Sequence, residues 1–94
     1  MENEIIVKFI EQENRSVALD DNKVIGECDY EINNNKWVIT HTLVSEEYGG
    51  RGIAKRLVLA IIDEARKQNI KIIPVCSYAK KMLEKEEYKD ILDF

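Results

Sequence analysis

The spacing of the apolar residues changes once along the chain, at a cluster that holds three of its four glycines, Gly49, Gly50 and Gly52. Before the cluster, apolar and polar residues alternate in short runs, which is the period of half-buried β-strands. After it, apolar residues recur every three to four positions, which is the period of an amphipathic helix. This order predicts that strands form the first half of the fold and that helices then pack on the sheet.

The first half of the sequence is predicted to form four strands. Residues 4–12 form the first, residues 15–32 contain two strands joined by a polar turn at 20–22, and residues 36–44 follow three asparagines at 33–35. Alternation in the third strand predicts one face made of Val24, Gly26, Cys28, Tyr30 and Ile32. In the fourth strand it predicts one face made of Trp37, Ile39, His41 and Leu43, and another made of Val38, Thr40, Thr42 and Val44.

The second half is predicted to form a helix, a strand and a second helix. The first helix runs for about five turns to Asn69, with an apolar stripe at Ala54, Leu57, Val58, Ile61 and Ala65. Residues 70–76 form a fifth strand, and Ser77 caps a helix over 78–88 whose Ala79, Met82 and Leu83 face the sheet. The order β-β-β-β-α-β-α predicts one α+β domain over residues 1–94 with a mixed sheet, because the helical crossover permits parallel pairing.

Composition excludes several classes of protein. The 94 residues are 45% hydrophobic and 34% charged, which is typical of a single globular domain with one core. The start of the chain carries acidic residues and no long apolar run, so neither a signal peptide nor a membrane span is expected. We therefore expect a cytoplasmic location. Cys28 and Cys76 lie far apart without metal-ligand spacing, which predicts reduced thiols and no metal site.

The charge of the chain changes sign at the glycine cluster. Residues 1–50 carry four Lys and Arg against eleven Asp and Glu, whereas residues 51–94 carry ten against seven. A local basic balance favours a small polyanion as the ligand over a nucleic acid, which binds a broader basic face. The alternative interpretation is that these charges are solvated helix faces without a ligand.

The glycine cluster lies where a strand is predicted to end and a helix to begin. The first N–H groups of a helix have no intrahelical partner and lie at the positive end of its dipole. Gly49, Gly50 and Gly52 would allow positive φ and close approach of a phosphate to these groups, with Arg51 and Lys55 at the rim. The alternative is that the glycines only form a tight turn.

Two common nucleotide motifs do not fit the cluster. A P-loop needs GxxxxGK followed by Ser or Thr, and the sequence has none. A dinucleotide-binding turn needs a third glycine where this chain has Lys55, and it normally follows the first strand of a parallel sheet.

The segment "VSEEYGGRGIAKRLV" resembles the acetyl-CoA-binding segment of the Gcn5-related N-acetyltransferases, whose pattern is Q/R-x-x-G-x-G/A. Gly49 stands at the Q/R position, Gly52 at the central glycine and Ala54 at the last small residue. The chain is most similar to a short branch of this family, with a His in the strand before the loop, a Pro-Cys strand end in "IIPVCSYAKKML" and the tail "KEEY". That branch has a truncated form of the fold, without the helices and strands that shape an acceptor pocket in larger relatives.

The resemblance implies that acetyl-CoA is a cosubstrate bound in a V-shaped gap between the fourth and fifth strands. Its pyrophosphate would lie on the N–H groups of residues 49–54, and its pantetheine arm would pair with the strand edge near Leu43 and Val44. The residues implied in binding are Leu43, Val44, Gly49, Gly50, Arg51, Gly52, Ile53, Ala54 and Lys55.

His41 and Cys76 are the candidate catalytic residues, because each lies near the end of a strand that flanks the implied gap. His41 would act as a base, and the alternative is a packed strand residue. Cys76 would accept the acetyl group as a thiolate favoured by the following helix and by His41, and the alternative is a small buried apolar residue. Tyr78 or Tyr88 could protonate the leaving thiolate, although aromatic packing is the favoured interpretation for both.

Two functions therefore remain open at this stage. The first is an acetyltransferase that moves acetyl from acetyl-CoA to an unidentified amine, directly or through Cys76. The second is a non-catalytic acetyl-CoA-binding module whose chemistry is weak or is supplied by a protein partner. For either function the expected protein is a monomer that binds neither nucleic acid nor membrane.

Overall fold

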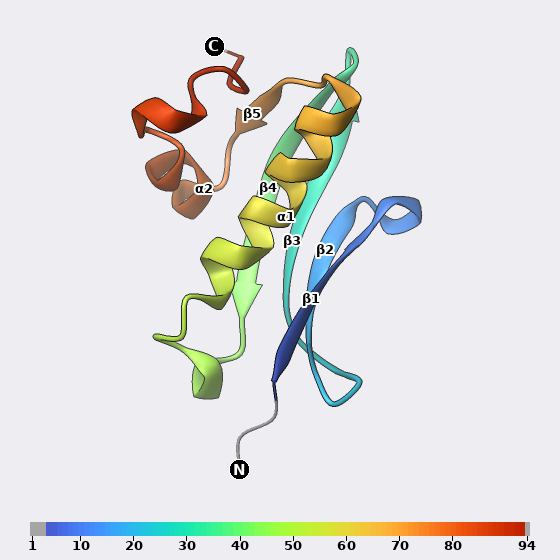
Figure 1. Ribbon diagram of the computed structural model, residues 1–94, viewed down its shortest axis with the longest axis vertical. Coiled ribbons are helices and arrows are strands. Elements are labelled where there is room, and N and C mark those ends of the chain that lie inside the picture. Colours follow the sequence, from blue (N-terminus) through green and yellow to red (C-terminus); the bar gives the residue numbers. More distant parts are fainter. Residues whose placement is uncertain (1–3, 94) are drawn as a thin grey trace.

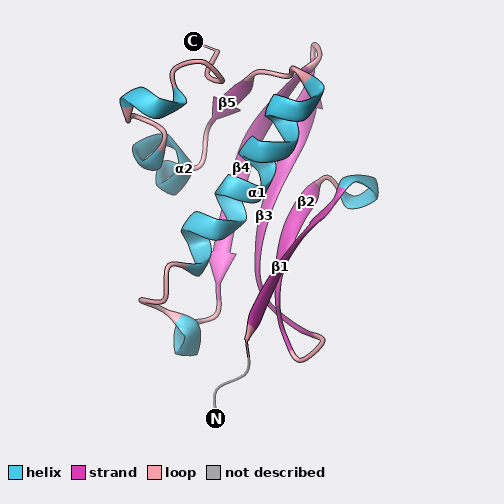
Figure 2. Ribbon diagram, viewed as in Figure 1, coloured by secondary structure: helices cyan, strands magenta, loops and turns pink. Residues whose placement is uncertain are grey.

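The computed structural model describes residues 4–93, which form one mixed sheet with two helices (Figures 1 and 2). The sheet holds five strands in chain order, β1 (Ile5–Ile10), β2 (Arg15–Asp20), β3 (Lys23–Asn33), β4 (Lys36–Val44) and β5 (Ile72–Pro74). The first four pair antiparallel, and β5 pairs parallel to β4. The helices are α1 (Ile53–Gln68) and α2 (Ser77–Met82), with 3-10 turns at Glu11–Glu13, Glu46–Tyr48 and Glu86–Tyr88. This architecture confirms the predicted α+β fold.

Helix α1 lies along the sheet and forms the core with it (Figure 1). Its buried residues are Ile53, Leu57, Val58, Ile61, Ile62 and Ala65, which include the predicted stripe except for the half-buried Ala54. The helix ends at Asn69 with a left-handed φ of 59°, as the sequence predicts. The buried Ser16 hydroxyl on β2 donates a hydrogen bond of 2.8 Å to the carbonyl oxygen of Leu57, which fixes the helix against the strand.

Each of two strands carries one extra residue that interrupts the alternation of its side chains. In the pairing of β2 with β3, Ala18 faces Gly26 but Leu19 faces Val24, so Ile25 is the extra residue. In the pairing of β3 with β4, Asp29 faces His41 but Tyr30 faces Ile39, so Thr40 is extra. A β-bulge of this kind shifts the following side chains to the opposite face of the strand.

The bulges make two predictions from alternation wrong. Trp37 and Ile39 are buried, as predicted for one face of β4, but His41 and Leu43 are exposed on the outer face of the sheet. Thr42 and Val44 take their place on the side of α1, where Val44 packs against the core. In β3 the bulge buries Ile25 and leaves Val24 exposed, and Ile32 at the end of the strand is exposed as well.

The C-terminal segment differs from the predicted long second helix. Helix α2 ends at Met82 instead of continuing to residue 88, and Ser77 is its first residue, with no side-chain cap on the helix. Ala79 and Leu83 are buried as predicted, and Met82 is partly buried against the core. The chain then returns to β5, where Ile72 donates to Ile91 and forms a parallel bridge with Leu92.

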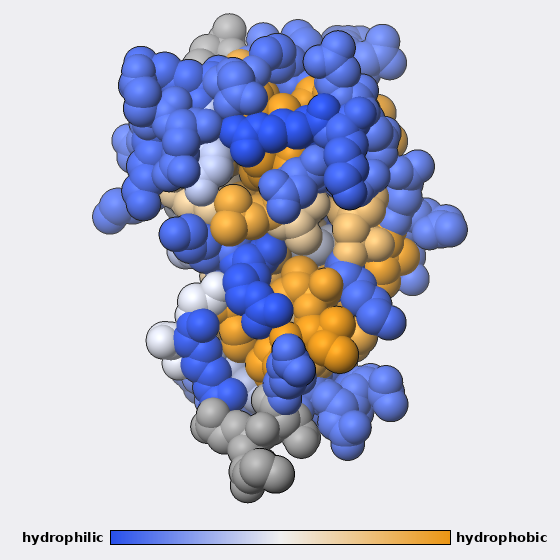
Figure 3. All heavy atoms as spheres, in the orientation of Figure 1, coloured by the Kyte–Doolittle hydropathy of each residue, from blue (hydrophilic) through white to orange (hydrophobic). Residues whose placement is uncertain are grey.

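Hydrophilic side chains cover most of the α1 side of the molecule (Figure 3). Apolar atoms remain visible in the middle of this face, between the lower half of α1 and β1. The C-terminal segment is held beside α1 by Arg66, whose guanidinium donates 2.8 Å to the carboxylate of Asp90 and lies 6.0 Å from the centre of the Tyr88 ring. Tyr88 is buried, as its packing interpretation predicts.

Candidate functional site

The turn before α1 depends on glycine at two positions. Gly50 has φ of +77° and Gly52 has φ of +75°, in the left-handed region that disfavours other residues. A Cβ atom at either position would meet nothing within 4 Å, so the requirement is conformational and these glycines leave open space above the backbone. Gly49 differs, because its φ of −62° is open to any residue, and the expectation of positive φ is wrong there.

The N-terminus of α1 is left without a cap. Gly52 is the N-cap residue and has no side chain to offer, and the first helical hydrogen bond runs from Arg56 N–H to Gly52 O at 3.2 Å. Within residues 4–93, the N–H groups of Ile53, Ala54 and Lys55 donate to no backbone carbonyl. The first turn holds no acidic residue. Such a helix end attracts an anion.

The predicted set of donors needs one correction. The N–H group of Gly49 donates to the carbonyl oxygen of Glu46 at 3.0 Å within the preceding 3-10 turn. It is therefore occupied, and the open donors begin closer to the helix than residue 49. Among the nearby cations, Arg56 donates 3.0 Å to the carbonyl oxygen of Ile5, whereas the Lys55 side chain is exposed at the rim.

The turn is held in place by contacts to the end of β2 and the start of β3. The Tyr48 hydroxyl donates to the carboxylate of Asp20, and this hydrogen bond raises the pKa of Tyr48. The Arg51 guanidinium lies 5.3 Å from the centre of the Tyr48 ring, within the range of a cation–π contact. Ser45 N–H donates to Ile25 O at 2.8 Å. The residues just before the glycines therefore anchor the glycine turn to the sheet.

A pocket of about 220 Å³ lies between this turn and the end of β4. Strand pairing between β4 and β5 stops at Ile39 and Pro74, and the N–H groups of Val75 and Cys76 both donate to the carbonyl oxygen of Ile39. The remaining residues of β4 have no β5 partner within the described part of the chain. The pocket lies beyond this unpaired stretch, at the end of β4, and is lined by Val44, Tyr48, Gly49, Gly50, Gly52, Ile53, Ala54 and Tyr78.

Three predicted binding residues do not line this pocket. Arg51 and Lys55 are exposed on the loop and the first turn of α1, at the rim. The Leu43 side chain is 54% exposed on the outer face of the sheet, because the bulge at Thr40 turned it away from α1. Only the backbone of Leu43 remains at the strand edge.

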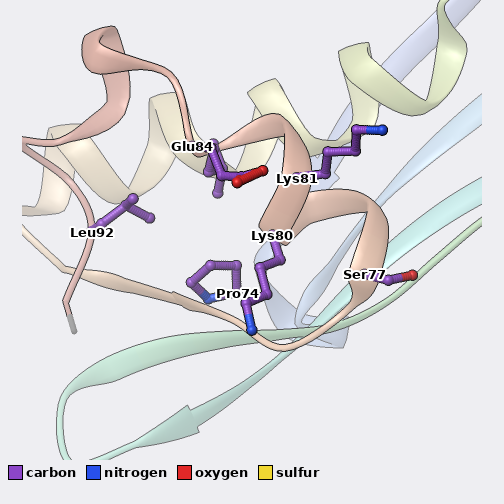
Figure 4. Close-up of a pocket in the computed structure, with 7 residues that line it drawn as sticks. Pro74, Ser77, Lys80, Lys81, Glu84 and Leu92 are labelled. Atoms are coloured by element: carbon purple, nitrogen blue, oxygen red, sulfur yellow. The ribbon is translucent and has the colours of Figure 1, made fainter.

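A larger pocket of about 430 Å³ lies elsewhere, between β5, α2 and the C-terminal segment (Figure 4). Pro74, Leu83 and Leu92 give it an apolar lining, and Lys80, Lys81 and Glu84 add charges of both signs. It has no glycine turn and no end of a long helix. The smaller pocket is therefore the better anion site, because the open N–H groups decide the chemistry and size does not.

Cys76 lies at the start of α2, on the α1 side of the sheet, in contact with β4. Its Sγ atom is 3.3 Å from the Thr42 hydroxyl oxygen, which is in turn 3.4 Å from the Sγ atom of Cys28. Cys28 is fully buried, and burial raises its pKa to about 12. Tyr78 is 41% exposed and lines the pocket, so it is not packed in the core as expected, and burial raises its pKa.

His41 is not brought together with Cys76. It lies on the outer face of β4, opposite Asp29 on β3, whereas Thr42 and Cys76 lie on the α1 side. Burial and, after it, the neighbouring Glu27 carboxylate raise the pKa of Asp29 to about 6, whereas the charges of His41 and Arg15 lower it. The predicted support of a Cys76 thiolate by His41 is therefore absent from this arrangement.

Two kinds of feature are absent from the described residues. Among residues 4–93, no group of three or more His, Cys, Asp and Glu side chains is arranged to hold a metal ion. In the same residues, no helix is long and apolar enough to cross a bilayer.

Comparison with known proteins identifies the family. The family model of the GCN5-related N-acetyltransferases matches residues 15–91. A GCN5-like candidate N-acetyltransferase from Staphylococcus aureus is 42% identical over 94% of this chain and 87% of its own, with a TM-score of 0.72. The chain belongs to the GCN5-related N-acetyltransferase family. No curated protein sequence matches it.

Larger acetyltransferases of this family share the fold over part of their length. A candidate streptothricin acetyltransferase from Bacillus anthracis, solved with acetyl-CoA, is 28% identical over 74% of this chain and 43% of its own (TM-score 0.59). A family member from Elizabethkingia anophelis, solved with acetyl-CoA bound, is 20% identical over 73% of this chain and 48% of its own (TM-score 0.60). The present chain thus spans less than half of each of these proteins.

The family pattern and the backbone agree at Gly52 and differ at Gly49. Gly52 has the left-handed φ that only glycine adopts readily. Gly49, at the position of Gln or Arg in the pattern, has an ordinary φ, and an added Cβ would lie 3.2 Å from Glu46 O. The departure from the pattern is therefore not imposed by backbone conformation.

Sequence reasoning missed two residues of the site. Tyr48 lines the pocket, as does Tyr78, which the sequence named as a candidate acid, and Thr42 joins the two thiols. Tyr48 could have been found, because it directly precedes the glycines. Thr42 could not, because alternation without the bulge placed it on the face opposite to that of Trp37 and Ile39.

Proposed function

We propose that this protein binds acetyl-CoA in the gap between β4 and β5 and transfers the acetyl group to an amine. The observation that carries the proposal is the uncapped N-terminus of α1 beside a pocket at the end of β4, beyond the point where β4 stops pairing with β5. Family membership supports it, as does the acetyl-CoA found in the B. anthracis and E. anophelis acetyltransferases.

The diphosphate of the cofactor is assigned to the glycine turn. The open N–H groups of Ile53, Ala54 and Lys55 converge at the positive end of a 16-residue helix. The exposed Lys55 and Arg51 side chains add positive charge at the rim. An anion at such a helix end gains about 0.3–1 kcal/mol from the dipole alone, and hydrogen bonds to a charged phosphate add about 1.5–3 kcal/mol each.

The thioester is assigned to the region where β5 leaves β4. The bulge at Thr40 lies one residue beyond the last pair of these strands, Ile39 with Pro74. A bulged residue is left out of the regular ladder, so its peptide group is the best candidate to donate to the thioester oxygen. A single oxyanion donor contributes on the order of 3 kcal/mol in enzymes where one has been removed.

Acetyl transfer through Cys76 would take two balanced steps. The Cys76 thiolate attacks the acetyl carbon, the carbon–sulfur bond to CoA breaks, and CoA leaves as a thiolate that takes up a proton. The amine then attacks the acetyl-cysteine, Cys76 leaves as the thiolate, and the nitrogen loses a proton to form the amide. In direct transfer the amine attacks acetyl-CoA itself, and an unassigned base accepts its proton.

A non-catalytic acetyl-CoA-binding module is the second candidate function. The separation of His41 from Cys76 across β4 favours it, because the only histidine cannot act on the thiol in this arrangement. Binding would then persist without transfer, and any chemistry would require an acceptor or a base from a protein partner.

Intact-mass measurement after incubation with acetyl-CoA separates the two functions. Covalent transfer predicts an adduct of about 42 Da on the protein. The adduct should be absent in Cys76→Ala and present in Cys28→Ala, because Cys28 is buried and protonated. Direct transfer predicts no adduct but acetylated product from a panel of small amines and peptides. Neither adduct nor product, with retained binding, would reject transfer in favour of the binding module.

A further inference from the structure

The two cysteines of the chain meet at one hydroxyl group. Cys76 Sγ, Thr42 Oγ1 and Cys28 Sγ form a continuous chain with separations of 3.3 and 3.4 Å, although the three residues come from α2's N-cap, β4 and β3. Because each sulfur lies within hydrogen-bond distance of the same oxygen, the two sulfurs are at most about 7 Å apart. The bulge at Thr40 creates this contact by turning Thr42 towards Cys28.

A hydroxyl between two sulfurs can donate to one while it accepts from the other. In the neutral arrangement, Cys76 donates to Thr42 and Thr42 donates to Cys28. If Cys76 loses its proton, both hydrogen bonds can reverse by rotation of the hydroxyl and thiol hydrogens alone. Cys28 S–H then donates to Thr42, and Thr42 O–H donates to the Cys76 thiolate, without movement of any heavier atom.

We propose that Cys28 and Thr42 are positioning residues that stabilise the thiolate of Cys76 through this reversible hydrogen-bond chain. The proposal deepens the proposed function, because it rests on Cys76 as the acetyl acceptor. It gives the thiol the support that His41 does not provide. It also gives a role to Cys28, which, like Cys76, is not among the residues that line the pocket beside α1.

Cys28 is suited to be a permanent donor. It is fully buried beneath α1, and burial raises its pKa to about 12, so it keeps its proton at neutral pH. A second negative charge therefore does not form beside the Cys76 thiolate. The other titratable groups near the hydrogen-bonded Cys76–Thr42–Cys28 contact are Tyr78 on α2, and Glu27, Asp29 and His41, which lie on the outer face of the sheet.

The pH dependence of Cys76 alkylation tests the hydrogen-bond chain in the absence of acetyl-CoA. The rate of reaction with iodoacetamide is followed by mass, with Cys76→Ser to measure any background at Cys28. Thr42→Val keeps the shape of the side chain and removes the hydroxyl, so the midpoint of the pH–rate profile should rise by about one pH unit, a tenfold loss of thiolate. Thr42→Ser, which restores the hydroxyl, should return the midpoint to the wild-type value.

Two outcomes would overturn the proposal. One is a Thr42→Val profile that overlays that of the wild type, and the other is a Thr42→Ser profile shifted as far as that of Thr42→Val. Should Thr42→Val not fold, Cys28→Ala provides the same test, with a smaller rise expected because Thr42 can still donate. An unshifted midpoint in Cys28→Ala would then contradict the proposed hydrogen-bond chain.

The alkylation test and the acetyl-CoA test fail independently. A shifted midpoint without any acetyl adduct would retain the hydrogen-bond chain and reject Cys76 as the acceptor. An acetyl adduct on the wild type, with an unshifted alkylation midpoint in Thr42→Val, would support the proposed function and reject the hydrogen-bond chain.

Discussion

Replacing Lys55 with glutamate should weaken acetyl-CoA binding about 10- to 100-fold while stabilising the free protein. The side chain lies exposed in the first turn of α1, beside the N–H groups assigned to the diphosphate. Reversing its charge replaces attraction with repulsion, which at this distance from a phosphate is about 1–3 kcal/mol. The same carboxylate interacts favourably with the helix dipole, by about 0.3–1 kcal/mol. Calorimetry gives the affinity, and urea unfolding gives the stability.

Lys67→Glu is the matched control for this prediction. Lys67 lies in the last turn of the same helix, with a side chain that is 75% exposed and a weak 3.9 Å contact to Glu64. Its reversal should leave acetyl-CoA affinity unchanged and should slightly destabilise the protein, because a carboxylate is unfavourable at a helix C-terminus. Equal loss of affinity in both variants would show that net charge, and not the α1 N-terminus, governs binding.

Gly26→Val should cost about 2–3 kcal/mol of stability, because this glycine is closed in on three sides. A Cβ atom there would lie 3.0 Å from the carbonyl oxygen of Leu43, 3.2 Å from the Leu57 side chain and 3.3 Å from the Val44 side chain. The larger side chain must push β4 or α1 outward. Urea unfolding followed by the fluorescence of Trp37, which is 3% exposed and the only tryptophan, reports the change.

Glu31→Val on the same strand controls for strand propensity. Glu31 is exposed and pairs with Val38, so valine there should be neutral or slightly stabilising. Gly26→Ala should fall between the wild type and Gly26→Val. Wild-type stability in Gly26→Val would contradict the close packing of α1 and β4 over this position.

The order of the elements and the start of α1 were predictable from local pattern. The alternating runs, the change of period at the glycines and the stripe through Leu57, Val58 and Ile61 are strong signals because they repeat over many residues. The left-handed φ at Gly50 and Gly52 followed from the position of the glycines between a strand and a helix. The fold and the loop side of the pocket therefore depend on information that lies within short segments.

The surroundings of Cys76 were not predictable, because they depend on the single-residue bulge at Thr40. Nothing in the run "KWVITHTLV" marks Thr40 as the extra residue, since both of its faces carry apolar and polar side chains. The insertion reverses the faces of every later residue in β4. His41 was expected beside Cys76 because each residue lies near the end of a strand that flanks the implied gap, whereas the structure places Thr42 there.

The early end of α2 has a tertiary cause. Residues 78–88 have good helix propensity, which favours one continuous helix. In the structure Leu83, Tyr88 and Ile91 are all buried. A single straight helix would point these side chains in different directions. The break after Met82 instead returns the chain to β5. Burial of apolar side chains outweighs the local preference.

An amide-resolved NMR titration with acetyl-CoA tests the binding site most directly. The proposed function predicts the largest shift changes at the N–H groups of residues 50–55 and along residues 40–44 of β4, with Lys55→Glu reducing both together. Changes confined to the pocket lined by Pro74 and Leu92, or no change at millimolar acetyl-CoA, would contradict the assignment of the cofactor to the α1 N-terminus.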